Sequence, residues 1–209
     1  MIFESFVVGM LQTNCYLLGD EKARKAVVID PGGDSARISQ RLRDAGLELT
    51  YILNTHAHFD HVTDCWALRR LAGGEVIMHP DDEVILSNRM VGMGAVAKSA
   101  GELAACRIDR LIRGGDQIEV GSLVFHVIET PGHTPGHVSF HLPLEKMIFV
   151  GDTLFAGSIG RTDFPGGSYD QLIRSVREKI FSLPGETLVY PGHGPETTVE
   201  RERLTNPFF

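Results

Sequence analysis

The segment that most constrains this chain is residues 54–61, which reads Asn-Thr-His-Ala-His-Phe-Asp-His and directly follows an apolar run. Alternate side chains of an extended segment share a face, so His56 and His58 can point the same way. Asp60 and His61 come after the turn and can point to a neighbouring spot. A polar loop with Asp60 as a helix N-cap is the alternative, but crowding these imidazoles without a cation costs desolvation and causes repulsion on protonation. Imidazole and carboxylate suit zinc, iron and manganese, so we interpret the segment as a metal site.

Length and charge limit the classes of protein that remain. A chain of 209 residues can bury one sizeable core, and we expect a single domain over residues 1–209. The net charge of −7 and pI near 5.7 argue against nucleic acid or an anionic membrane as partner. No run approaches the ~18 apolar residues of a membrane span, and the first residues do not resemble a secretory signal. The cysteines form no C-x-x-C motif and indicate neither disulfides nor a thiolate zinc site, so we expect a reduced, cytoplasmic protein: Cys15, Cys65 and Cys106.

The order of apolar runs and turn signals predicts two packed sheets flanked by helices. We expect strands at 2–8, 14–19, 26–29, 50–53, 76–78, 117–120, 123–128, 137–142, 147–150 and 187–190. We expect helices at about 34–45, 62–71, 81–88, 168–181 and 197–204, with Asp34 or Ser35 as cap of the first, Gly46 as its stop and Ser168 as cap of the fourth. Residues 80–115 read either as a surface excursion or, because 90–95 are rich in Met and Gly, as a mobile wall over the site.

Three later turns share a pattern in which a strand ends, a glycine follows, and a ligand-type residue comes next. They are Pro-Gly-His at 131–133, Gly-Asp at 151–152, and Pro-Gly-His at 191–193. Glycine permits sharp turns and close backbone approach, and strand ends at one edge of a sandwich bring side chains together on a rigid support. A lone histidine after a strand is usually structural, but three such turns behind one H-x-H-x-D-H motif favour a shared site.

These motifs, in this order, resemble the metallo-β-lactamase superfamily over nearly the whole chain. The resemblance implies an α/β fold, a four-layer αβ/βα sandwich. Within the superfamily, Gly-Asp-Thr-Leu-Phe at 151–155 and Thr-Asn-Pro-Phe at 205–208 resemble the hydroxyacylglutathione hydrolases of the glyoxalase II type. The chain matches their short form, which lacks the helical C-terminal extension.

The resemblance implies two divalent cations per chain, zinc with iron or manganese as alternatives. The first would be bound by His56, His58 and His133, the second by Asp60, His61 and His193, and Asp152 would bridge both. Four histidines are not carried over: His79, His126, His137 and His141. Of these, His137 reads as a strand residue or as a hydrogen-bond partner of the site. Asp30 is either a turn aspartate or a hydrogen-bond partner of a ligand imidazole.

The implied activity is hydrolysis of a small thioester, of the S-D-lactoylglutathione type found in methylglyoxal detoxification. Two cations lower the pKa of a shared water towards about 7, and the hydroxide attacks the thioester carbonyl. Asp60 would orient that nucleophile. The resemblance places Arg161 at a position that contacts glutathione, although Asp163 stands where Tyr is frequent; an ordinary loop arginine is the alternative.

A rival class shares much of this motif set. Persulfide dioxygenases use one iron held by two histidines and a carboxylate, here His56 or His58 with His133 and Asp152, and the Gly-Arg-Thr-Asp-Phe segment at 160–164 resembles them equally well. The 151–155 segment and the tail favour the hydrolase. A β-lactamase is disfavoured because no export signal precedes the domain, and an intact set of ligands disfavours a non-catalytic metal-binding protein.

Overall fold

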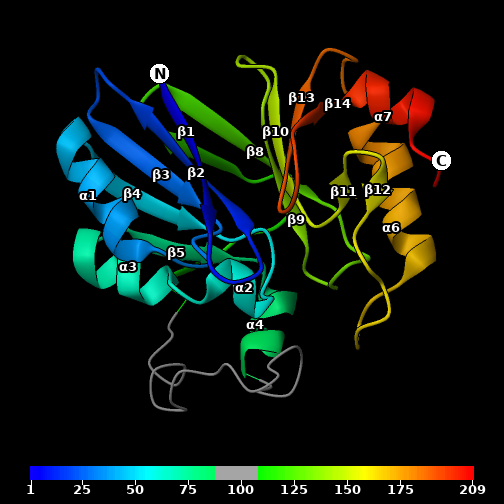
Figure 1. Ribbon diagram of the computed structural model, residues 1–209, viewed down its shortest axis with the longest axis horizontal. Helices are drawn as coiled ribbons and strands as arrows, with labels where there is room; N and C mark the ends of the chain where they lie inside the picture. The colour runs from blue at the N-terminus through cyan, green and yellow to red at the C-terminus, as the bar shows by residue number, and fades with distance from the viewer. Residues whose placement is uncertain (88–107) are drawn as a thin grey trace.

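Four layers stack in this protein, with two sheets in the middle and helices on both outer faces (Figure 1). The computed structural model describes residues 1–87 and 108–209. Three apolar clusters separate the layers, one under the N-terminal helices, one between the sheets and one under the C-terminal helices. This arrangement confirms the αβ/βα sandwich expected from the order of elements.

The first sheet has six strands in sequence order: β1 (Ile2–Val8), β2 (Thr13–Asp20), β3 (Lys25–Ile29), β4 (Glu48–Leu53), β5 (Glu75–Met78) and β6 (Arg110–Leu111). β1, β2 and β3 pair antiparallel, whereas β3 to β6 run parallel. Parallel pairing requires crossovers, and the helices between these strands are α1 (Ser35–Ala45), α2 (Phe59–Val62), α3 (Cys65–Ala72) and α4 (Pro80–Ser87).

The second sheet also has six strands, ordered β14-β13-β10-β9-β8-β7. Their bounds are β7 (Gln117–Val120), β8 (Leu123–Glu129), β9 (Val138–Leu142), β10 (Met147–Gly151), β13 (Leu188–Pro191) and β14 (Thr197–Thr198). A small hairpin of β11 (Leu154–Phe155) and β12 (Ser158–Ile159) stands apart, and the helical segments are α6 (Tyr169–Ser175), η1 (Val176–Ile180) and α7 (Val199–Thr205). The pair β10 and β13 is parallel.

The apolar runs of β3 and β10 explain why each sheet carries helices on its outer face. Val27 points into the core between the sheets, while its neighbour Val28 points into the core under α1 and α3. Phe149 and Ile148 divide in the same way between the inter-sheet core and the core under α6. Strands buried on both faces need covering layers, so the sandwich has four layers instead of two.

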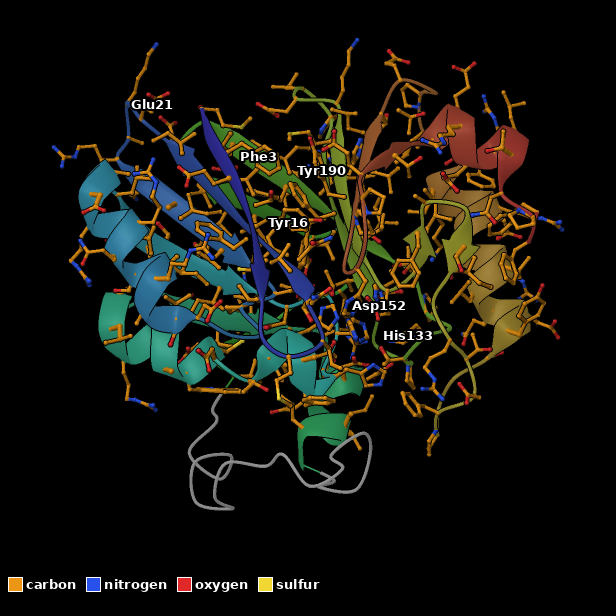
Figure 2. All side chains as sticks on the ribbon, in the orientation of Figure 1. Phe3, Tyr16, Glu21, His133, Asp152 and Tyr190 are labelled. Atoms are coloured by element: carbon orange, nitrogen blue, oxygen red, sulfur yellow. The ribbon has the colours of Figure 1, made fainter. Side chains whose placement is uncertain are left out.

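An aromatic group ties the two sheets together above the candidate site. Phe3, Tyr16 and Tyr190 meet between the sheets (Figure 2), with the ring centroids of Phe3 and Tyr190 4.9 Å apart. The Tyr16 hydroxyl donates a hydrogen bond of 2.6 Å to the carbonyl of Pro191. This bond attaches β2 to the end of β13, where the last ligand-bearing turn begins.

The ends of the predicted helices are confirmed in part. Gly46 ends α1 in the left-handed conformation with φ 63°, and the Ser168 hydroxyl accepts from the Gln171 N–H at the start of α6. The expected cap of α1 is wrong: Asp34 occupies the N-cap position but makes no side-chain cap. The Asp64 carboxylate accepts from the Ser35 N–H instead, at 2.9 Å. Tertiary contact has replaced the local cap.

Other elements depart from the sequence expectations. The helix expected over 168–181 changes to π geometry after Ser175, and the Phe181 N–H donates to the Val176 carbonyl five residues back. The β11–β12 hairpin, β6 and β14 are too short to show a periodic pattern. Most of the segment 80–115, read either as a surface excursion or as a wall over the site, lies outside the described residues. Within the described ranges, no helix is both long and apolar enough for a membrane span.

Candidate metal centre

The seven predicted ligands lie at one edge of the sandwich, where strands of both sheets end. His133 and Asp152 mark that edge in Figure 2, below the aromatic group. The turns that carry the ligands follow β4, β8, β10 and β13. β8, β10 and β13 point the same way, because β10 pairs parallel with β13 and both β8 and β10 pair antiparallel with β9, so their carboxyl ends meet at one edge. The end of β4, in the other sheet, reaches the same edge, where the Val138 N–H donates to the Thr55 carbonyl at 2.9 Å. The structure therefore brings together every residue that the motif and the three glycine turns singled out.

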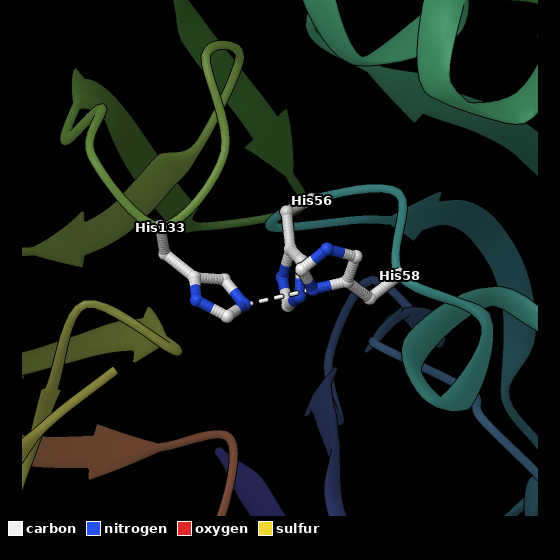
Figure 3. Close-up of side chains that lie close together, drawn as sticks. All are labelled: His56, His58 and His133. Carbon is white, nitrogen blue, oxygen red and sulfur yellow. Dashed lines mark hydrogen bonds between the residues drawn. The ribbon is translucent and has the colours of Figure 1, made fainter. Parts of the chain in front are cut away.

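Three imidazoles form the first ligand set, His56, His58 and His133, and all are buried. One ring nitrogen of each lies within 4.8 Å of the others. Figure 3 shows the rings converging from two loops, with His58 Nδ1 and His133 Nε2 2.8 Å apart. A histidine triad with one open side is the protein part of a catalytic zinc site.

The second ligand set consists of Asp60, His61 and His193. The Nε2 atom of His193 lies 3.2 Å from Asp60 Oδ2, and His61 Nε2 lies 3.6 Å from the same oxygen. Asp60 also accepts a hydrogen bond of 3.1 Å from the Thr13 hydroxyl. The Asn14 side-chain amide donates to the carbonyls on either side of the His193 turn, at 3.0 and 2.8 Å. β2 thus helps to position the second set.

Asp152 lies between the two sets. Its carboxylate oxygens are 3.5 Å from His133 Nε2, 3.4 Å from His61 Nε2 and 3.8 Å from His193 Nε2. Among the described residues, Asp152 alone forms close pairs with imidazoles of both sets; Asp30 groups with His56 and His61 but pairs closely only with His61. This position suits the bridging role that the resemblance implies.

Hydrogen bonds on the far side of three imidazoles fix which ring nitrogen faces the centre. His133 Nδ1 donates to the Arg161 carbonyl at 2.7 Å, and His61 Nδ1 lies 3.0 Å from Asp30 Oδ2. His56 Nδ1 lies 3.0 Å from the Thr55 hydroxyl, which itself donates to Asp30. Each Nδ1 therefore carries a proton, and each ring directs Nε2 to the centre, which is the nitrogen that metal ligation would use. Asp30 acts as hydrogen-bond partner of a candidate ligand.

Burial and charge shift the pKa values of this cluster. Burial lowers the pKa of His56, and lowers the pKa of His58 to about 3, with neighbouring imidazoles adding to the effect. Burial opposes protonation of His61 too, but Asp152 and Asp30 hold its pKa well above the usual range. The imidazoles of the first set are therefore neutral, while the carboxylates around His61 demand positive charge.

Three buried polar atoms at the centre are placed to bind a cation and have no hydrogen-bond partner among the described residues. His56 Nε2, His61 Nε2 and Asp152 Oδ1 have no hydrogen-bond partner. An unpaired buried donor or acceptor costs about 1–3 kcal/mol. Within 1–87 and 108–209, no lysine or arginine pairs with Asp152 or Asp60. The cluster thus supports binding of divalent metal.

Two glycines permit the close packing around Asp152. A Cβ on Gly192 would lie 2.2 Å from Asp152 Oδ1 and 2.6 Å from His61 Cε1. A Cβ on Gly160 would lie 1.8 Å from the Asp152 carbonyl oxygen. A side chain at either position would displace Asp152, which explains why glycine precedes His193 in the sequence.

Arg161 contributes to the site through its backbone as well as its side chain. Its carbonyl holds His133, but its guanidinium forms a two-pronged pair with Asp163 at 2.7 and 2.6 Å. The guanidinium also stacks 3.9 Å from the centre of the Phe164 ring, which contacts His58. An anionic ligand would have to compete with Asp163 for this arginine.

Two further residues support the ligand sets: His137, which the sequence already suggested as a hydrogen-bond partner of the site, and Asp82, which sequence reasoning missed. His137 is buried, and its Nε2 accepts from the Asp152 N–H at 3.1 Å, so it supports the bridging residue without joining either ligand set. Asp82 accepts three hydrogen bonds from the loops of the first set. Burial raises its pKa, against the effect of these donors. Cys65 is buried and its thiol donates to Asn54 Oδ1, which excludes it as an exposed nucleophile.

Fold and site together define a metallohydrolase-type protein. The model of the metallo-beta-lactamase superfamily matches residues 8–193, and the chain belongs to this superfamily.

Two of the similar proteins carry the names of two different activities. The hydroxyacylglutathione hydrolase GloC of Haemophilus influenzae is 35% identical over 100% of this chain and 98% of its own length. The mitochondrial persulfide dioxygenase ETHE1 of Bos taurus is 40% identical over 93% of this chain and 70% of its own length.

Solved structures agree on the fold. The B3 metallo-beta-lactamase BLEG-1 superposes with a TM-score of 0.88 at 37% identity, over 99% of each chain. TTHA1623, solved in a di-iron-bound form, superposes with a TM-score of 0.82 at 35% identity, over 99% of this chain and 100% of that one. Neither comparison separates the hydrolase from the dioxygenase.

Proposed function

We propose that this protein is a cytoplasmic thioester hydrolase that binds two divalent cations and cleaves a hydroxyacylglutathione of the S-D-lactoylglutathione type. The observation that carries the proposal is the pair of adjoining ligand sets with Asp152 in contact with both. A mononuclear oxygenase needs only one of these sets. The relation to GloC supplies the substrate class. We take zinc as the native metal, with iron or manganese as substitutes, because imidazole and carboxylate suit all three.

The bound cations would supply Lewis acidity and an ionised water at neutral pH. The chain's own residues would supply the geometry. Asp60, held by the Thr13 hydroxyl at 3.1 Å, would orient the attacking water through its carboxylate and accept the proton that the water loses. Attack forms a carbon–oxygen bond at the thioester carbonyl, the carbon–sulfur bond breaks, and the thiol leaves with the proton.

Arg161 would bind a carboxylate of the glutathione portion. Because Asp163 occupies the guanidinium in two-pronged fashion, the substrate must displace that contact, and we expect a high KM. Both side chains of this ion pair are exposed, and exposed ion pairs are weak because water screens them, so a substrate carboxylate can displace Asp163 at little cost. Arg161 would thus favour anionic substrates and contribute modestly to their affinity.

Persulfide dioxygenase activity is the competing candidate, and the 40% identity to ETHE1 favours it. That chemistry would use two imidazoles of the first set, His133 with either His56 or His58, together with Asp152.

Metal content and turnover of one preparation distinguish the two. The hydrolase should contain near two metals per chain and hydrolyse S-lactoylglutathione without oxygen. One iron per chain with persulfide-dependent oxygen uptake would overturn the proposal.

A further inference from the structure

Asp82 is a fully buried carboxylate on the first turn of α4, outside the two ligand sets. Its Oδ2 accepts from the Ala57 N–H and from the Thr134 hydroxyl, each at 2.8 Å. Its Oδ1 accepts from the Gly136 N–H at 2.6 Å. Hydrogen bonds to an ionised carboxylate are shorter and stronger than hydrogen bonds between neutral groups.

These donors belong to the two loops that carry the first ligand set. Ala57 lies between His56 and His58, 25 residues from Asp82 in sequence. Thr134 follows His133 directly, 52 residues from Asp82. The first loop extends from one sheet and the second from the other, as Figure 3 shows for the three imidazoles. The carboxylate therefore spans the gap that the ligand set must bridge.

The backbone around Asp82 is built for this contact. A Cβ on Gly136 would lie 2.5 Å from the Asp82 backbone nitrogen and 2.7 Å from its Oδ1. Only glycine lets the second loop approach the carboxylate this closely. The contact is thus a packed feature of two loops and one helix, and it is independent of any ligand.

We propose that Asp82 is a positioning residue that sets the spacing of the first ligand set and thereby the affinity of the first cation. This inference rests on the proposed metal site. Asp82 touches neither cation nor substrate; it fixes the backbone on both sides of the gap, so that His58 and His133 meet at the separation a cation needs. Ligands held in place before binding lose less freedom when the cation arrives.

The test is Asp82→Asn, with metal affinity of the two sites measured by titration against a competing chelator. The substitution keeps the shape but places an amide N–H against one of the donors. Loss of an outer partner of a ligand costs about 10–100-fold in metal affinity. We expect a loss of that size for the first equivalent of metal, a changed absorption spectrum of cobalt bound there, and little change for the second equivalent.

Asp20→Asn is the matched control. Asp20 is also buried and accepts from three backbone N–H groups, those of Lys22, Ala23 and Ser122, across two segments. It is the last residue of β2 and precedes Glu21, which Figure 2 shows at the end of the sandwich away from His133 and Asp152. This variant should unfold at lower temperature and keep both metal affinities, because it disturbs the fold and not the ligand loops.

Thr134→Val and Thr134→Ser provide a second, milder pair. Valine removes one donor to Asp82 and should weaken the first cation less than Asp82→Asn does, while serine should restore the affinity. This pair decides the matter if Asp82→Asn does not fold.

Unchanged affinity for the first cation in both Asp82→Asn and Thr134→Val would overturn the inference. So would an equal loss in Asp20→Asn. Failure of the unaltered protein to bind metal would instead overturn the proposed function, and the two failures are therefore distinguishable.

Discussion

The two ligand sets differ in how firmly the protein holds them. The first consists of three buried imidazoles; Thr55, the Arg161 carbonyl and Asp82 hold the rings and loops from behind. The second includes a carboxylate and an imidazole whose side chains are 12% and 29% exposed, Asp60 and His193. A buried, pre-arranged site binds more tightly than one open to water. From this difference in burial we propose that the first set binds the tighter cation and that the second lies nearer the substrate.

The largest expected effect is loss of metal from both ligand sets at once. Asp152→Ala removes the one carboxylate in contact with each set, so we expect loss of both cations and of thioester hydrolysis together. Loss of a ligand exceeds the ~10–100-fold cost of losing an outer partner, so the fall in affinity should exceed about 100-fold. Metal analysis and turnover of the folded variant check this. Full activity would remove Asp152 from the bridging role.

The next prediction separates the sets. His193→Ala should leave one tight equivalent of metal, because the first set is untouched, whereas His133→Ala should leave only the weaker equivalent. Both variants should lose most hydrolysis. Titration against a chelator measures the difference. If His193→Ala lost both cations and His133→Ala kept a tight one, the ranking of the two sets would be reversed.

A smaller effect distinguishes the role of the Arg161 carbonyl, which holds His133, from the role of its guanidinium in substrate binding. Arg161→Ala keeps the carbonyl that holds His133, so metal content should be unchanged, while KM for an anionic thioester should rise more than kcat falls. Asp163→Asn should do the opposite and lower KM up to about fivefold, because it frees the guanidinium from an exposed and therefore weak ion pair. Steady-state kinetics of the two variants test this. An unchanged KM in both would leave the pair without a role in binding.

The smallest expected effect is on stability at low pH and concerns Asp20, which lies away from both ligand sets. Hydrogen bonds from Ala23, Ser122 and Lys22 hold the pKa of Asp20 below its usual range. A depressed pKa stabilises the folded state above the ordinary aspartate pKa of about 3.9, and this stability is lost as pH falls below it. Thermal unfolding of metal-free protein should therefore show a steeper loss below about pH 4 than Asp20→Asn shows. Identical pH profiles would contradict this.

The order of strands and helices was predictable because the long elements carry their own signals. β3 and β10 are continuous apolar runs, and α1 ends at a glycine with positive φ. The short hairpin β11–β12 was missed because two-residue strands have no period. The cap of α1 was missed because Asp64, 29 residues away, replaces the local side chain.

In the candidate site too, some residues were predictable from local sequence patterns and others were not. The spacing of the ligand motif and the repeated glycine turns were visible in the sequence, and the structure brings those seven residues together. Asp82 was invisible because an acidic residue early in a helix normally faces solvent, and its partners lie 25 to 54 residues away. The role of the Arg161 carbonyl was equally hidden, since every residue has one. Contacts from side chain to distant backbone leave no sequence pattern.

The most direct test is anomalous diffraction from crystals of the metal-loaded protein. The account predicts two peaks of anomalous density on either side of Asp152, one among His56, His58 and His133 and the other among Asp60, His61 and His193. A single peak at saturating metal, or peaks away from Asp152, would contradict it.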